Sequence, residues 1–189
     1  MDSPDEVFST DACLFGCGGV CDDQYFHGVF PPFIFEQNLY IRSLEVLSIV
    51  VALKLWGTCW TGLSITVLCD NKAAVAVVNT GRCGNHFMNS CLNDICYFAT
   101  LYEFEVCAVQ VPGVSNHFAD LLSRWDSYNA FSAIDIIGKT LPFLMRCSGL
   151  TVHSKSGPSL SQVSANSAVF DRISSTRSAL HNVLELSVT

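Results

Sequence analysis

EVFSTDACLFGCGGVCDDQYFHGVF, residues 6–30, is the stretch that constrains the fold most strongly. It alternates segments of strand character with glycine-rich and acidic breaks, and a proline pair follows it at residues 31–32, where a strand must end. We expect strands at residues 6–13, 20–21 and 25–30, a glycine turn over residues 16–19 and a hairpin connection at residues 22–24. The stretch therefore predicts three consecutive antiparallel strands.

Helical and strand patterns alternate after this ribbon. The strongest helix is predicted over residues 38–56, where apolar side chains form one stripe: Ile41, Leu44, Leu47, Val51 and Leu55. We then expect a buried strand at 63–69, helices at 71–79 and 87–101, a strand at 105–111, and a last helix capped by Ser115 and running to about Arg124. This order predicts an α/β fold with a mixed five-stranded sheet, three antiparallel strands followed by β-α units, and helices on both faces.

Composition excludes several classes of protein. The 189 residues are 50% hydrophobic and 14% charged, which is incompatible with global disorder. The richest apolar window, residues 44–56, is interrupted by Glu45 and Lys54, so it falls short of the ~18 residues that a membrane span needs. The acidic N-terminus lacks the pattern of a signal peptide. We therefore read the ten cysteines as reduced thiols and expect an intracellular protein of the cytoplasm or nucleus, neither secreted nor attached to a membrane.

The composition changes along the chain and predicts a boundary. Residues 1–125 hold the alternating pattern, whereas residues 148–178 contain 10 serines and have the composition of a linker. We therefore predict a folded domain at residues 1–125 and a C-terminal extension at residues 126–189. Protease cleavage is expected first between residues 154 and 167.

Charge is unevenly distributed. Residues 1–125 carry 13 acidic and 5 basic side chains, a net charge of −8. This balance argues against non-specific binding of nucleic acid by a basic face. It leaves room for an enzyme acting on nucleic acid, because divalent cations held by clustered carboxylates face phosphates and invert the local charge.

Four carboxylic acids occupy unusual places. Asp11 and Asp70 are each predicted at the end of a strand, while Glu45 and Asp120 lie among apolar residues of predicted helices. A buried carboxylate is costly unless it is paired or binds a metal. Taken singly, each acid is compatible with a cap, a turn or a solvated helix face. Together they predict one divalent-metal site, and two ions about 3.5–4 Å apart are the arrangement that hydrolyses phosphodiesters.

The motifs around these acids resemble those of retroelement ribonuclease H domains, in the style of gypsy-like and especially DIRS-like retrotransposons. The resemblance covers residues 7–125 in the family's order and spacing. Its motifs are TDACLFGCGG at residues 10–19, LE at 44–45, CDNKAAV at 69–75 and the very specific VPGVSNHFADLLSR at 111–124.

This resemblance implies a ribonuclease H fold and cleavage of the RNA strand of RNA–DNA hybrids with two Mg²⁺ or Mn²⁺ ions. The implied catalytic, metal-binding residues are Asp11, Glu45, Asp70 and Asp120, and the implied nucleic-acid contacts are Asn71, Lys72 and Asn116. It also implies an upstream reverse transcriptase domain and a downstream recombinase or integrase. Residues 174–180 faintly resemble the start of a recombinase-type helical domain.

An alternative remains open at this stage. The same fold could serve as a catalytically inactive structural or interaction module, or belong to a decayed fragment of such an element. The presence of all four acids argues against loss of the site. Asn71 and Asn116 are each compatible with capping a helix as well as with contacting a substrate or ordering the region of Asp120.

Overall fold

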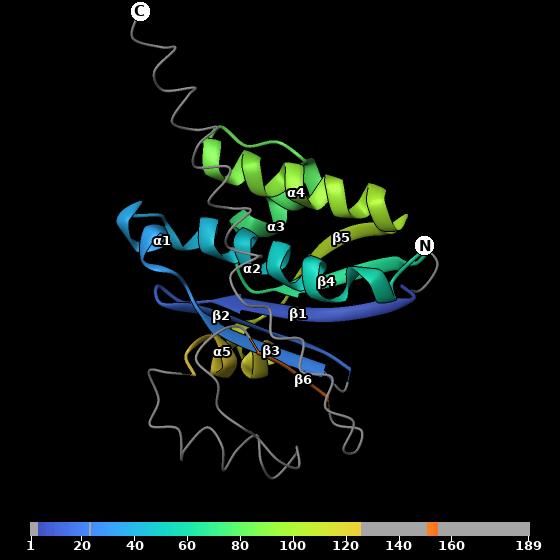
Figure 1. The fold of residues 1–189 in the computed structure, drawn as a ribbon, viewed down its shortest axis with the longest axis horizontal. Helices are drawn as coiled ribbons and strands as arrows, with labels where there is room; N and C mark the ends of the chain where they lie inside the picture. The colour runs from blue at the N-terminus through green and yellow to red at the C-terminus, as the bar shows by residue number, and fades with distance from the viewer. Residues whose placement is uncertain (1–3, 23, 126–150, 155–189) are drawn as a thin grey trace, which may run out of the picture.

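The computed structural model describes residues 4–22, 24–125 and 151–154. Its centre is a six-stranded mixed sheet with the strand order β5-β4-β1-β2-β3-β6. Helices α2, α3 and α4 lie on one face of the sheet, and α5 lies on the other (Figure 1). The predicted α/β class, with three antiparallel strands followed by β-α units and helices on both faces, is confirmed.

The first three strands form the predicted antiparallel ribbon, but their limits correct one expectation. They are β1 (Glu6–Ala12), β2 (Gly16–Cys21) and β3 (Gln24–Val29). The glycines at 16, 18 and 19, predicted to form a turn, lie inside β2, where Gly18 pairs with Asp11 and Gly19 with Thr10. Strand propensity predicted a turn at these glycines, because glycine is depleted in strands. That preference does not take into account the close packing at this position, for which only glycine is small enough.

The remaining elements follow the predicted order with small shifts. Strand β4 (Ser64–Cys69) pairs in parallel with β1 and with β5 (Glu105–Gln110). The helices on this side are α2 (Ile41–Trp56), α3 (Lys72–Thr80) and α4 (His86–Tyr102), and the short 3₁₀ helix η1 (Gly57–Cys59) follows α2. Both β1 and β4 therefore end at the same edge of the sheet, where Asp11 and Asp70 lie.

Helix α2 is buried on more sides than its predicted stripe indicated. It packs on β1 and β2 and is covered by α3 and α4. Ile41, the first residue of the stripe, is 40% exposed, whereas the polar residues Ser43, Glu45 and Ser48 are buried. A helix enclosed between a sheet and other helices buries more than one face, so one stripe could not define its core contacts.

Besides η1, three elements of the described residues were not predicted. The short helix α1 (Pro32–Glu36) begins where the ribbon was expected simply to end, with proline in its first turn, which suits a residue without an N–H. The 3₁₀ helix η2 (Gly113–Ser115) precedes α5 (His117–Ser123), so Ser115 is not the cap of that helix. Strand β6 (Thr151–Ser154), in the predicted extension, pairs antiparallel with β3 and makes the sheet six-stranded rather than five-stranded.

The rest of the predicted extension, including the serine-rich stretch and residues 174–180, lies outside the described residues. No helix in the described part of the chain is both long and apolar enough to be a membrane span.

Glycine at position 18 allows α5 to approach the sheet closely. A Cβ atom added to Gly18 would lie 2.4 Å from the Leu122 Cβ and 2.6 Å from the Ser123 backbone nitrogen. We expect Gly18→Ala to lower the free energy of unfolding by about 1–3 kcal/mol, because overpacking displaces α5. Chemical denaturation measures this change. Gly84→Ala is the control, because nothing lies within 4 Å of that added Cβ; equal stability of the two variants would contradict the close approach.

Candidate active site

The site lies at the edge of the sheet where β1 and β4 end. Asp11 is on β1, Asp70 directly follows β4, Glu45 comes from α2 and Asp120 from α5. Two of the acids are thus held by neighbouring strands, and the other two are brought in by helices from opposite faces of the sheet (Figure 1).

Asp11 is almost completely enclosed, with 3% of its surface exposed. Burial, together with the charges of Asp120 and Asp70, raises its pKa to about 6. The Ser123 hydroxyl donates a hydrogen bond to Asp11 Oδ2 at 2.6 Å and partly opposes that rise. The protein therefore stabilises the ionised form of Asp11 less well than water does, which is why its pKa lies above the ordinary value of 3.8.

Glu45 is buried to the same degree and is perturbed more strongly. Burial is the largest cause, and the charges of Asp11 and Asp70 add to it, so that its pKa rises to about 9. The backbone N–H of Ala12 and the thiol of Cys69 donate to this carboxylate, the thiol at an Sγ–Oε2 distance of 3.8 Å. These donors do not compensate for the burial, so Glu45 is protonated at neutral pH unless a cation binds.

Asp70 adjoins Glu45 at the open side of the site. Oxygen atoms of Asp70 and Glu45 and the Sγ of Cys69 all lie within 4.8 Å of one another. Asp70 is half-buried, and its Oδ2 lies against Gly113 of η2, where an added Cβ would be 3.3 Å away. Because Cys69 is buried beside Glu45, its own pKa rises to about 12, which keeps the thiol protonated and able to donate.

Asp120 forms the outer side of the site, and its side chain is 33% exposed. The guanidinium of Arg124, one helical turn later, donates from Nε to Asp120 Oδ1 at 2.6 Å. The charge of Asp120 also contributes to the raised pKa of Asp11. Asp120 and Asp11 lie outside the 4.8 Å group formed by Glu45, Cys69 and Asp70, yet the electrostatic coupling links all four predicted acids.

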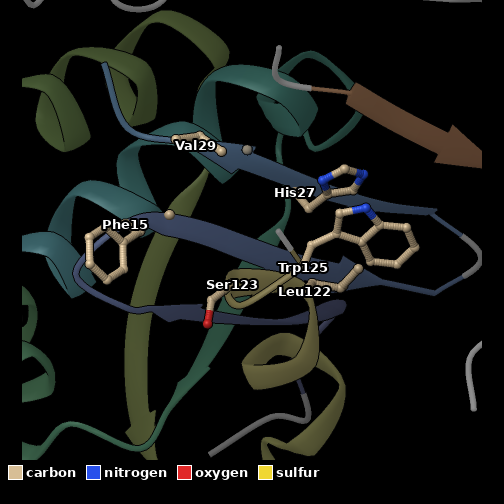
Figure 2. A pocket seen from close by; sticks show the side chains of 8 residues that line it. Phe15, His27, Val29, Leu122, Ser123 and Trp125 are labelled. Carbon is tan, nitrogen blue, oxygen red and sulfur yellow. The ribbon is translucent and has the colours of Figure 1, made fainter. Parts of the chain in front are cut away.

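The end of α5 is fixed by packing beside this site. Figure 2 shows a small pocket there, in which the ring of Trp125 lies against His27, with ring centroids 4.5 Å apart and an interplanar angle of 20°. The neighbouring residues Leu122 and Ser123 also line the pocket. This stacking packs the residue two positions after Ser123 against β3.

The three predicted nucleic-acid contacts have different surroundings. Asn71 is the N-cap of α3, and its side-chain oxygen accepts from the backbone N–H groups of Ala73 and Ala74, at 3.1 and 3.2 Å. Lys72 is exposed at the first position of α3. Contact with nucleic acid stays a prediction for both residues.

Asn116 requires a correction. It is only 1% exposed, and its side-chain nitrogen donates to the Thr10 carbonyl oxygen at 2.9 Å, so it does not present its side chain to a ligand. It also makes no side-chain capping bond to α5. Its structural effect is to tie the start of α5 to β1, one residue before Asp11.

Three residues near the acids were not predicted to belong to the site: Cys69, Ser123 and Arg124. The four-residue spacing between Asp120 and Arg124 was a signal for Arg124, since it places an acid and a base side by side on a helix. Cys69 and Ser123 lie within the motifs at residues 69–75 and 111–124. Their contacts with the acids could not be predicted, because they depend on how α5, β1, α2 and β4 are packed together.

The donor set fits a hard divalent cation. Carboxylate oxygens are the protein ligands that Mg²⁺ prefers. Glu45 and Asp11 have raised pKa values because burial, and to a lesser extent like charges, oppose their ionisation, and a bound cation would favour the ionised form of both.

No protein-family model matches the sequence, and no curated protein matches it. Among solved structures, the chain is similar to LC11-RNase H1, isolated from compost, in complex with an RNA/DNA hybrid. The TM-score is 0.52 at 16% identity, over 62% of this chain and 92% of that one.

Two further solved structures are similar. RNase H1 from the halophilic archaeon Halobacterium salinarum NRC-1 gives a TM-score of 0.49 at 11% identity, over 64% of this chain and 95% of that one. The foamy viral protease-reverse transcriptase in complex with an RNA/DNA hybrid gives 0.46 at 14% identity, over 66% of this chain and 20% of that one. The strand order β5-β4-β1-β2-β3 and the likeness to LC11-RNase H1 establish that this chain has the ribonuclease H fold.

Proposed function

We propose that this chain is a metal-dependent ribonuclease H that cleaves the RNA strand of RNA–DNA hybrids. The observation that supports the proposal is the grouping of Glu45, Cys69 and Asp70 within 4.8 Å, with Asp11 and Asp120 coupled to this group electrostatically and the pKa values of Asp11 and Glu45 raised by burial and by neighbouring carboxylates. Such perturbed groups gathered at one place are typical of catalytic sites.

The four acids have distinct positions with respect to a bound cation. Asp11 lies in β1 and Asp70 directly follows β4, so paired strands fix their backbones. Asp70 and Asp120 lie towards solvent, where a phosphate can approach. We infer that all four hold Mg²⁺ or Mn²⁺, in a two-ion arrangement. When bound, such ions activate a water molecule and stabilise the leaving oxygen of a phosphodiester.

The choice of an RNA–DNA hybrid as substrate rests on two supports. LC11-RNase H1, which shares the fold, was solved with an RNA/DNA hybrid. The sequence motifs around the acids also resemble those of retroelement ribonuclease H domains. We expect recognition of the RNA strand through its 2′-hydroxyl groups in the wide minor groove.

We further propose that the domain acts in retrotransposon reverse transcription inside the cell. The support is the specific motif VPGVSNHFADLLSR at residues 111–124, which is similar to that of gypsy-like and DIRS-like elements. The expected partners are a reverse transcriptase domain and a recombinase or integrase. Because residues 1–125 carry few basic side chains, we expect the chain alone to bind a hybrid weakly and such partners to strengthen that binding.

A second candidate is a catalytically inactive module with the same fold. The observation that favours it is the negative net charge, because residues 1–125 contain 5 basic and 13 acidic side chains. An enzyme that binds phosphates without a partner usually has a basic face. This candidate predicts no hydrolysis and no response to divalent cations.

Cleavage of a labelled 20-base-pair hybrid by the purified chain, with and without Mg²⁺, tests the proposed function. We expect Mg²⁺-dependent cuts in the RNA strand and none in RNA–RNA or DNA–DNA duplexes of the same sequence. Asp11→Asn is the matched inactive variant and guards against a contaminating nuclease. Cleavage that persists in this variant, or an inert wild-type chain that also ignores Mg²⁺ in thermal melts, would favour the inactive module.

A further inference from the structure

Arg124 is the positive charge built into the acid site. It directly follows α5, and its Nε contacts Asp120 Oδ1 at 2.6 Å. The pKa of Arg124 is raised by the hydrogen bond to Asp120 and by the charges of Asp120 and Asp11. The guanidinium thus interacts with two of the four acids from a position at the edge of the site.

The pair is placed where it can open. The side chains of Arg124 and Asp120 are 45% and 33% exposed, so no packed core holds the guanidinium on the carboxylate. Exposed ion pairs of this i,i+4 kind contribute little to stability, and their geometry is easily exchanged for another partner. The backbone of Arg124 is fixed by its hydrogen bond to the Asp120 carbonyl oxygen and by the packing of Trp125.

A divalent cation bound to the acids weakens the ion pair between Arg124 and Asp120. The cation competes for the same Asp120 carboxylate and repels the guanidinium. A released guanidinium still lies beside the site, in a region of the chain with few other basic groups. Its planar set of donors matches the non-bridging oxygens of a phosphate.

We propose that Arg124 is the counterion of the metal-free acid set, that it leaves Asp120 when a divalent cation binds, and that it then contacts a phosphate of the nucleic acid. The first part concerns the acid set alone. The phosphate contact rests on the proposed function, and in it Arg124 is a phosphate-positioning residue of the same site.

Metal affinity tests the counterion role without any need for catalysis. Mg²⁺ is titrated in thermal melts of the full chain and of Arg124→Gln. We expect about threefold to tenfold tighter apparent Mg²⁺ binding in Arg124→Gln, because the cation no longer competes with a guanidinium. Lys54→Gln is the control with the same change in net charge; it lies nine residues after Glu45 on α2, roughly 13 Å along the axis. Unchanged or weaker Mg²⁺ binding in Arg124→Gln overturns the counterion role.

Binding of an intact hybrid tests the phosphate contact. Fluorescence anisotropy of a labelled hybrid is measured in Ca²⁺, so that the readout is independent of turnover. We expect about tenfold weaker binding for Arg124→Gln, the effect of losing a charge-assisted pair of hydrogen bonds. Arg124→Lys should recover part of the affinity, since lysine keeps the charge without the planar fork.

The outcomes separate the two proposals. Equal hybrid affinity of the wild type, Arg124→Gln and Lys54→Gln refutes the phosphate contact even if the wild type cleaves hybrids. A wild type that does not cleave, but whose hybrid binding weakens selectively in Arg124→Gln, refutes the proposed function and leaves the phosphate contact standing. Absence of any hybrid binding refutes the phosphate contact together with the proposed function.

Discussion

Asp70→Asn is expected to abolish hybrid cleavage while leaving the fold intact. Asp70 follows β4, which is paired on both sides by β1 and β5, so its backbone position does not depend on the carboxylate charge. Asparagine keeps the shape and one acceptor oxygen but removes the charge that binds the cation. We expect a rate loss of at least about 10²–10³-fold, comparable with the loss of one electrostatic contact to a transition state.

Single-turnover cleavage of a labelled hybrid at saturating Mg²⁺ measures this loss. Asp94→Asn, on α4, is the matched control, because it makes the same chemical change away from the acids. Thermal melts of both variants report whether the fold is intact. Cleavage by Asp70→Asn at the rate of the wild type would show that Asp70 does not bind the catalytic cation.

Acidification from pH 8 to pH 5 is expected to stabilise the metal-free protein. The pKa of Glu45 rises from 4.5 to about 9 on folding, and that of Asp11 from 3.8 to about 6. Between the lower and the higher value of each pair, the folded state keeps a proton that the unfolded state has lost. Stability is therefore present at low pH and is lost as pH rises through these windows, pH 4.5–9 for Glu45 and 3.8–6 for Asp11.

The size of the effect follows from the same linkage. Over three pH units Glu45 contributes on the order of 2–4 kcal/mol, which corresponds to a rise of about 10 °C in the midpoint of thermal unfolding. Mg²⁺ should reverse much of the loss at pH 8, because it binds the ionised acids. Glu45→Gln has no such carboxyl group and should show a much flatter pH profile. A wild-type midpoint that rises from pH 5 to pH 8 without metal would contradict the buried acid set.

The four acids were predicted as a site from the sequence because their neighbours are informative, and their shared role in binding a cation stays a prediction. An aspartate at the end of an apolar strand, or a glutamate inside an apolar helix, stands out from its local pattern, and strands of one sheet bring such positions together. The residues that hold the acids do not stand out. Ser123 contacts Asp11 across 112 positions in the chain, and the docking of α5 on β1 and β2 brings them together.

The errors in the predicted fold have a similar origin. The glycines in β2 suggested a turn, because glycine weakens an ordinary strand. In this structure the absence of a side chain at Gly18 lets Leu122 and Ser123 pack directly on the sheet. Helix α1 and strand β6 are five and four residues long, too short for a periodic pattern to identify. Long elements such as α2 and β4 were located within about three residues, since their patterns extend over many positions.

The pairing of β6 with β3 has a consequence for the order in which the molecule assembles. Gln24 pairs with Ser154, so this ladder joins segments that are far apart in the chain. Contacts of such long range have a large loop-closure cost and form late, whereas the other five strands and the helices of the described residues lie within residues 6–123. During synthesis from the N-terminus, the acid site can therefore assemble before the residues of β6 leave the ribosome. We expect the amides of the β3–β6 ladder to exchange with solvent faster than those of the β1–β4 ladder at the centre of the sheet.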